Sequence, residues 1–134
     1  MNISYLMWAI IAIVCIYILY YWLQLILNSN PLAIYPKDAI ELIGSEHFQI
    51  ILDVRTNEEW QSGHLPLAQH LPMSSLDYVR TYIPDKQKRI LIYCRTGLRA
   101  KIAAYKLLEM GYINVKYLVG NWNELMKYPF TFKY

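Results

Sequence analysis

The stretch RILIYCRTGLRA, residues 89–100, places an apolar run, a basic turn and the start of an amphipathic run in direct succession. Residues 89–93 are rich in aliphatic side chains, which is typical of a buried strand. After the turn, small and aliphatic residues recur at helical spacing, at Ala100, Ala103, Ala104, Leu107 and Leu108. A strand that passes through a short turn into a helix indicates an α/β fold. Gly97 gives the turn the backbone freedom it needs.

The same alternation continues on both sides of this stretch. Further strands are predicted at residues 49–54, 68–71 and 115–119. Helices are predicted at residues 37–43, 57–61, 75–82, 98–110 and 122–127. The helix at 57–61 has a clear start signal, because Thr56 and Glu59 form a capping-box pattern. Alternating strands and helices predict an α/β fold with a parallel sheet flanked by helices on both faces.

In open parallel sheets, ligands bind beyond the carboxyl ends of the strands. The residues that follow strands 49–54 and 89–93 are therefore expected to converge on a site. Asp53 and Arg55 are predicted to lie at one rim of that site, and Cys94 at the other.

The first 36 residues differ in composition from the rest of the chain. Asp, Glu, Lys, Arg and His are all absent before Lys37. Residues 3–27 form an apolar run longer than the roughly 20 residues that span a bilayer as a helix, with aromatic residues toward both ends. We predict a transmembrane helix within residues 1–30, a short linker at 28–36 and a folded domain at 31–134.

A signal peptide and a buried core helix are the alternatives for this run. A signal peptide has a positively charged start, a shorter apolar stretch and a small-residue cleavage site. The run has no Lys or Arg and is too long. Lys37 is the basic residue close to its C-terminal end, which favours a single-pass membrane protein with the folded domain in the cytoplasm.

Charge and cysteine content limit the classes of function. The formal net charge of +3 comes from 13 basic and 10 acidic residues, which is too weakly basic to indicate nucleic-acid binding. The two cysteines are Cys15, in the apolar run, and Cys94, so the folded part has no internal disulfide framework. The three histidines do not stand at metal-ligand spacing with Cys94. We expect no metal and no cofactor.

Cys94 stands at the start of the turn between strand and helix. Backbone N–H groups in such a turn can point inward and bind an anion, and the N-terminus of the helix adds partial positive charge. Arg95 and Arg99 add full charges. These surroundings favour thiolate over thiol, so Cys94 is a candidate nucleophile. A small hydrophobic residue at the end of a buried strand is the alternative.

Two separated motifs resemble the rhodanese domain. RILIYCRTGLRA is similar to the active-site loop of that family, and LDVRTNEEWQSGHLPLAQHLP to its upstream motif. A third, shorter likeness is LVGNW, and the resemblance covers about residues 34–130. Leu67, His70 and Val119-Gly120 depart from the residues usual in the family, at positions that concern turns and packing. The residues in register in the upstream motif are Asp53, Arg55, Glu59, Gly63, His64, Pro66, Ala68 and Pro72.

The resemblance implies a sulfurtransferase in which Cys94 is the catalytic nucleophile. Its thiolate would take a sulfane sulfur from a small-molecule donor such as thiosulfate, and the resulting persulfide would pass the sulfur to a thiol or an acceptor protein. The substrate-binding residues it implies are Arg95, Thr96, Gly97, Leu98 and Arg99, whose backbone N–H groups would hold the persulfide. Arg95 and Arg99 would also steer anionic donors, and Thr96 could add a hydroxyl donor.

The loop disfavours one alternative function and leaves a second one open. Phosphatases of the same fold need Cys-x5-Arg, whereas Arg99 follows Cys94 after four residues. A rhodanese-like domain can also act as a non-catalytic interaction module at the membrane. With no second cysteine close to Cys94 in the sequence, the sulfur acceptor is expected to be external.

The upstream motif residues are expected to be structural. We predict that Asp53 satisfies backbone groups, that Arg55 pairs with Glu59, and that His64 is a hydrogen-bonding strut in its turn.

Overall fold

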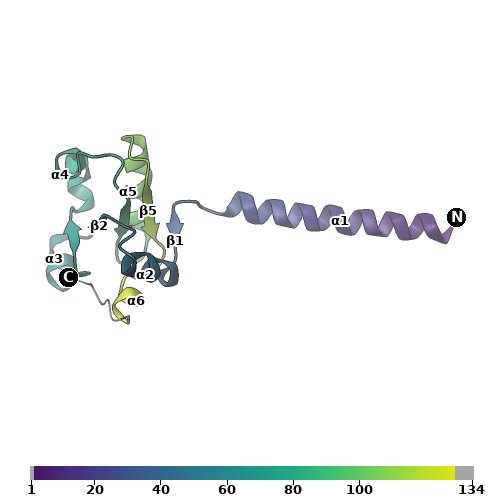
Figure 1. Ribbon diagram of the computed structural model, residues 1–134, viewed down its shortest axis with the longest axis horizontal. Helices are drawn as coiled ribbons and strands as arrows, with labels where there is room; N and C mark the ends of the chain where they lie inside the picture. Colours follow the sequence, from purple (N-terminus) through teal and green to yellow (C-terminus); the bar gives the residue numbers. More distant parts are fainter. Residues whose placement is uncertain (1, 129–134) are drawn as a thin grey trace. The chain divides into compact units, whose positions relative to one another are not determined.

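The computed structural model describes residues 2–128, so the last residues of the predicted domain, 129–134, lie outside the described part. The chain forms two compact units, one ending at Pro31 and the other beginning at Leu32. Figure 1 shows the long helix of the first unit and the sheet of the second.

The first unit contains one helix, α1 (Ile3–Asn28). Its 26 residues correspond to a length of about 39 Å. It has no acidic residue in its first turn and no basic residue in its last, and its side chains are almost all exposed. Residues Ile3–Leu27 are long and apolar enough to cross a membrane.

The second unit is built on one five-stranded sheet with the order β1-β5-β4-β2-β3. All four strand pairs are parallel, as the alternation of elements predicts. All four residues of the central strand β4 are buried, because helices cover both faces of a parallel sheet. The strands are β1 (Ala33–Ile34), β2 (Ile50–Asp53), β3 (Ala68–His70), β4 (Ile90–Tyr93) and β5 (Val115–Leu118).

Helices divide the core into two buried clusters. On one face, α5 (Leu98–Glu109), the 3₁₀ helix η1 (Met73–Tyr78) and α4 (Val79–Tyr82) pack on the sheet. On the other face, α2 (Pro36–Gly44) and α6 (Asn123–Met126) contact each other and cover the second cluster; they lie together in Figure 1. The short helix α3 (Asn57–Gln61) follows β2. Alternate residues of the strands point into alternate clusters, as the pleat requires.

Two predicted segments differ from the structure. The linker predicted at 28–36 contains the edge strand β1. The carbonyls of Leu32, just before this strand, and of Ile34, at its end, accept the N–H groups of Tyr117 and Val119 at 2.8 and 2.9 Å. The helix predicted at 75–82 begins earlier, as η1, and becomes α-helical only in its last turn. Two residues are too few to show the alternation by which a strand is recognised in a sequence. The strand β1 forms because it pairs with its neighbour β5.

Candidate active site

The site lies where β2 and β4 end side by side. Asp53 and Tyr93 are register partners at the ends of these strands, so the next residues, Val54 and Cys94, lie next to each other. Val54 and Cys94 belong to the same buried cluster as α5. Tyr93 belongs to the cluster on the opposite face. The two strand ends lie together as predicted, but the pleat directs neighbouring residues to different faces, so that Arg55 packs toward Trp122 on the face opposite Cys94.

Cys94 is buried, and its sulfur accepts two backbone hydrogen bonds. The Gly97 N–H lies 3.1 Å from Cys94 Sγ and the Ala100 N–H lies 3.4 Å from it. Both donors stand at the N-terminus of α5, where backbone N–H groups have no partner within the helix. They are polarised toward the sulfur by the helix dipole. This arrangement stabilises negative charge on Cys94 Sγ or on a sulfur attached to it.

Gly97 is held in a conformation that other residues avoid. Its φ is +97°, in the left-handed region. A Cβ at this position would lie 2.9 Å from the Gly120 nitrogen and 3.1 Å from the Leu118 carbonyl oxygen. The turn therefore packs directly against the segment after β5, and the glycine is required by space as well as by φ.

The other predicted binding residues take different positions. Arg95 and Thr96 are exposed in the turn, and Leu98 is the exposed first residue of α5. Arg99 is half-buried, and its Nη1 and Nη2 donate to both carboxylate oxygens of Glu59 at 2.7 and 2.8 Å. Its charge is thus compensated within the protein.

Glu59 links the Arg99 side chain to the start of α3. Its Oε2 accepts the Thr56 N–H at 2.9 Å, and the Thr56 hydroxyl accepts the Glu59 N–H, which confirms the predicted capping box. The hydrogen bonds from Arg99, aided by those from Thr56, lower the pKa of Glu59 to about 2. The same pair raises the pKa of Arg99. Glu59 is therefore ionised throughout the physiological range.

The predicted pairing of Arg55 with Glu59 is wrong. Arg55 is buried and instead binds Asp53, with Nη2 2.7 Å and Nε 2.9 Å from Oδ2. It also donates to the Gly63 carbonyl at 2.6 Å and lies 4.4 Å from the centre of the Trp122 ring. Burial by itself would lower the pKa of Arg55. The hydrogen bonds to Asp53 and the negative charge of Asp53 outweigh this effect, so the pKa of Arg55 is raised.

His64 and His70 support the α3 turn. His64 stacks on Trp60 with ring centroids 3.5 Å apart, and its Nδ1 lies 3.0 Å from the Trp60 carbonyl oxygen, which confirms the predicted strut. His70 stacks on Trp60 at 4.8 Å, and its Nε2 lies 2.9 Å from the Arg55 carbonyl oxygen. His70 thus connects the end of β3 to the segment after β2.

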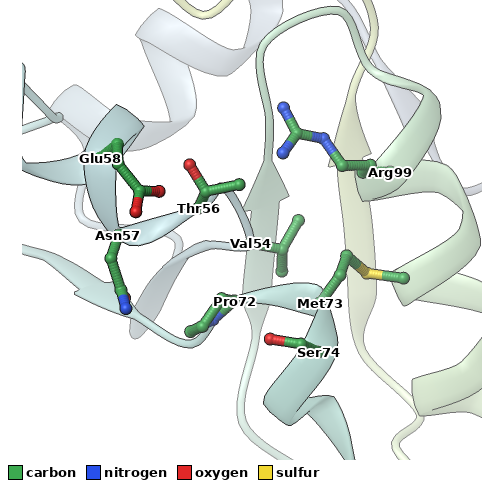
Figure 2. Close-up of a pocket in the computed structure, with 8 residues that line it drawn as sticks. All are labelled: Val54, Thr56, Asn57, Glu58, Pro72, Met73, Ser74 and Arg99. Atoms are coloured by element: carbon green, nitrogen blue, oxygen red, sulfur yellow. The ribbon is translucent and has the colours of Figure 1, made fainter.

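A pocket of about 340 Å³ opens beside the start of α5. Figure 2 shows the Arg99 side chain extending from α5 toward Thr56, and the Glu58 carboxylate directed into the same hollow. Met73 closes the pocket near Val54, whose carbonyl accepts the Met73 N–H at 3.1 Å. The lining residues are Val54, Thr56, Asn57, Glu58, Pro72, Met73, Ser74 and Arg99.

Three features of this site are absent from the sequence prediction. The Ala100 N–H lies one residue beyond the predicted binding segment, although the free N–H groups of a helix's first turn could have indicated it. The Glu59–Arg99 pair joins residues 40 positions apart, for which the sequence holds no signal. The contribution of residues 72–74 to the pocket likewise depends on how η1 packs.

Comparisons with known proteins show which family this chain resembles. The family model described as Rhodanese-like domain matches residues 35–127. Thiosulfate sulfurtransferase PspE of Escherichia coli is 30% identical over 79 residues, which cover 58% of this chain and 73% of PspE. Adenylyltransferase and sulfurtransferase UBA4 of Candida albicans is 35% identical over 92 residues. That match covers 63% of this chain and only 21% of UBA4, so the chain spans about a fifth of that protein.

Solved structures share the fold. The solution structure of protein hp1203 from Helicobacter pylori has a TM-score of 0.61 at 33% identity, covering 76% of this chain and 88% of that one.

Proposed function

The chain belongs to the rhodanese-like domain family, and on this premise we propose that it is a sulfurtransferase that carries a sulfane sulfur on Cys94. The names of PspE and UBA4 both include sulfurtransferase. The observation that carries the proposal is the pair of N–H groups, from Gly97 and Ala100, directed at Cys94 Sγ. A thiolate held in this way is prepared for nucleophilic attack.

The first step transfers sulfur to Cys94. With thiosulfate as donor, the Cys94 thiolate attacks the outer sulfur, and a Cys94–S–S bond forms. The bond between the two sulfurs of thiosulfate breaks, and its electron pair leaves with sulfite. The product is a persulfide anion whose charge remains beside the N-terminus of α5, where backbone N–H groups and the helix dipole stabilise it.

The second step regenerates the enzyme. An external thiophile takes the terminal sulfur, and the electron pair of the persulfide bond returns to Cys94. The chain's other cysteine is Cys15, which lies in α1. We therefore assign the acceptor role to a small thiol or to a cysteine of another protein.

Mass spectrometry of the intact chain tests the proposal. After incubation with thiosulfate, Cys94 should gain the mass of one sulfur atom, and addition of a thiol should remove it. The Cys94→Ser variant should gain nothing, whereas Cys15→Ser should behave as the unchanged protein. Absence of the sulfur adduct over a range of sulfane donors would contradict the proposal.

The burial of Cys94 supports a second candidate, a non-catalytic interaction module at the membrane. The cysteine has no exposed surface in this structure, so a donor can reach it only after side chains around it move. An interaction module would leave Cys94 unmodified by donors and would retain its partners in a Cys94→Ser variant. Capture of the same partners by both forms, without a sulfur adduct, would favour this second function.

We also propose that α1 anchors the domain to a membrane as a single span, with the domain in the cytoplasm. The support is the length and apolar composition of residues Ile3–Leu27 and the position of Lys37. The full chain should remain in membranes after alkaline extraction, and a protease added outside intact cells should not cleave the domain. Release of a shortened, soluble chain would instead indicate a signal sequence.

A further inference from the structure

The two charged residues that line the pocket near Cys94 differ in whether their charge is compensated by an ion pair. Glu58 is one of them, and hydrogen bonds from its own backbone N–H and from the Thr56 hydroxyl lower the pKa of Glu58, so it is ionised at neutral pH. Arg99 is the lining cation, and both its terminal nitrogens bind Glu59. Glu59, which lies outside the lining, therefore neutralises Arg99, and Glu58 is left as the lining charge that has no ion-pair partner among the described residues.

The remaining charges of the turn do not alter this balance. Arg95 is exposed and is not part of the pocket lining. The other lining side chains, among them Thr56, Asn57 and Ser74, are neutral and polar or apolar.

The pocket is also the hollow adjacent to the reactive sulfur. Val54, in its wall, lies beside Cys94 at the ends of β2 and β4 and belongs to the same buried cluster. Arg99, also in its wall, has a pKa raised mainly by its hydrogen bonds to Glu59 and, to a smaller extent, by negative charge on the nearby Cys94. Cys94 itself is buried and is not part of the lining, so a substrate seated here reaches the sulfur only when side chains of the wall move.

We propose that this pocket admits the sulfur acceptor to Cys94 and selects thiols that bear a positive charge over thiols that bear a carboxylate. The inference rests on the proposed sulfurtransferase function and assigns the substrate class of its second step. Suitable acceptors are aminothiols, or a protein cysteine flanked by basic residues. Their cationic group would lie against Glu58, and polar contacts to Thr56, Asn57 and Ser74 are available around it.

The transfer itself involves no net oxidation. The sulfur of the acceptor thiol attacks the terminal sulfur of the Cys94 persulfide, and a new S–S bond forms. The bond between Cys94 Sγ and the terminal sulfur breaks, and its electron pair stays on Cys94 as a thiolate. The thiol proton moves to the transferred sulfur, so that the acceptor leaves as a persulfide.

The charge preference has a predictable size. In a water-like dielectric, a unit charge about 6 Å from Glu58 changes the association constant of the reagent that carries it about threefold. A positive charge raises the constant and a negative charge lowers it. Replacing a cationic by an anionic reagent reverses the sign, so removal of the Glu58 charge should change the cation-to-anion ratio about tenfold. At about 1 M salt, where the screening length is near 3 Å, most of the preference should disappear.

Charged thiosulfonate reagents test the pocket without requiring sulfur transfer. The full chain in detergent is treated with 2-(trimethylammonium)ethyl or with 2-sulfonatoethyl methanethiosulfonate, and labelling of the Cys94 peptide is followed by mass spectrometry. In each reaction, Cys94 forms a disulfide with the reagent and methanesulfinate leaves. For each protein, the labelling rate with the cationic reagent is divided by the rate with the anionic reagent. Dividing this ratio for the Glu58→Gln variant by the ratio for the unchanged protein cancels the intrinsic reactivities of the reagents.

We expect Glu58→Gln to lower the cation-to-anion ratio about tenfold. Glu41→Gln removes a carboxylate from α2, on the opposite face of the sheet, and should leave the ratio unchanged. The same shift should appear when a Cys94 persulfide is discharged by cysteamine compared with 3-mercaptopropionate. An unchanged ratio in Glu58→Gln, or failure of both reagents to label Cys94, would overturn the inference.

The outcomes separate this inference from the proposed function. If the labelling ratio shifts but no donor adds sulfur to Cys94, the charge selectivity of the pocket is supported and the sulfurtransferase function is refuted. If sulfur is added and discharged but Glu58→Gln leaves both ratios unchanged, the function stands and the acceptor class is refuted.

Discussion

Replacement of Glu59 by glutamine should weaken the domain in a pH-dependent way. The substitution removes the charge that binds Arg99 but keeps an oxygen that can accept the Thr56 N–H, since glutamine also serves at this position of a capping box. The expected loss of stability therefore isolates the ion pair from the helix cap.

The magnitude follows from the pKa of Glu59. A fall from its ordinary 4.5 to about 2 corresponds to about 3.4 kcal/mol. The Arg99 and Glu59 side chains are 34% and 25% exposed, so solvent screening reduces this figure. We expect Glu59→Gln to lower the free energy of unfolding by about 1–2 kcal/mol at pH 7.

The sign of the pH dependence is fixed by the direction of the shift. The folded-state pKa of Glu59 is below its unfolded value, so its contribution is complete above pH 4.5 and is lost as pH falls toward about 2. The stability gap between the two proteins should therefore shrink to below about half by pH 3.

Urea unfolding of the full chain in detergent, followed by near-ultraviolet circular dichroism, measures this gap. Glu58→Gln is the matched control, because Glu58 is exposed and makes no ion pair in the described part of the chain; its effect on stability should be clearly smaller than that of Glu59→Gln. The same gap for Glu59→Gln at pH 7 and at pH 3 would refute the ion-pair explanation.

Three further substitutions test the turn, the buried pair and the helix cap. Gly97→Ala should destabilise the domain by more than 1 kcal/mol and abolish sulfur loading, because of its φ of +97° and the backbone nitrogen 2.9 Å from the added Cβ; Gly44→Ala, with open space around it, is the control in urea unfolding. Asp53→Ala should cost about 3–5 kcal/mol by the same measurement, since it leaves Arg55 buried without its carboxylate; a cost near zero would contradict this. Thr56→Ala should cost about 1 kcal/mol, and Thr56→Ser, which keeps the capping oxygen, should recover most of it.

Features that depend on neighbours in the sequence were predictable. The capping box at Thr56 and Glu59 lies within four consecutive residues, and the structure has it as predicted. Strand β4 was recognisable because a strand buried on both faces is a continuous apolar run. The position of Cys94 between this strand and α5 then follows from the turn that joins them.

Features that depend on distant residues were not predictable. For the Glu59 carboxylate, the sequence offered Arg55, four residues away, but the structure selects Arg99, which is 40 residues away. Arg55 points instead to the face of the sheet that contains Trp122 and forms its own pair with Asp53. The pleat of β2 directs Arg55 away from Glu59, so Arg99 is the arginine that pairs with Glu59. The pairing of β2 with β4 fixes the register that sets this direction.

By itself, the sequence determined the class of fold, the apolar N-terminal helix and a cysteine at the mouth of a basic turn, because periodicity, composition and turn residues act locally. Only the tertiary structure decided which charges of that turn remain available. It brings Glu59 of α3 to Arg99 of α5, and it adds Glu58 and residues 72–74 to the pocket wall. The turn is basic as a sequence, but the pocket beside it is not, because ion pairing depends on distance in space rather than on separation along the chain.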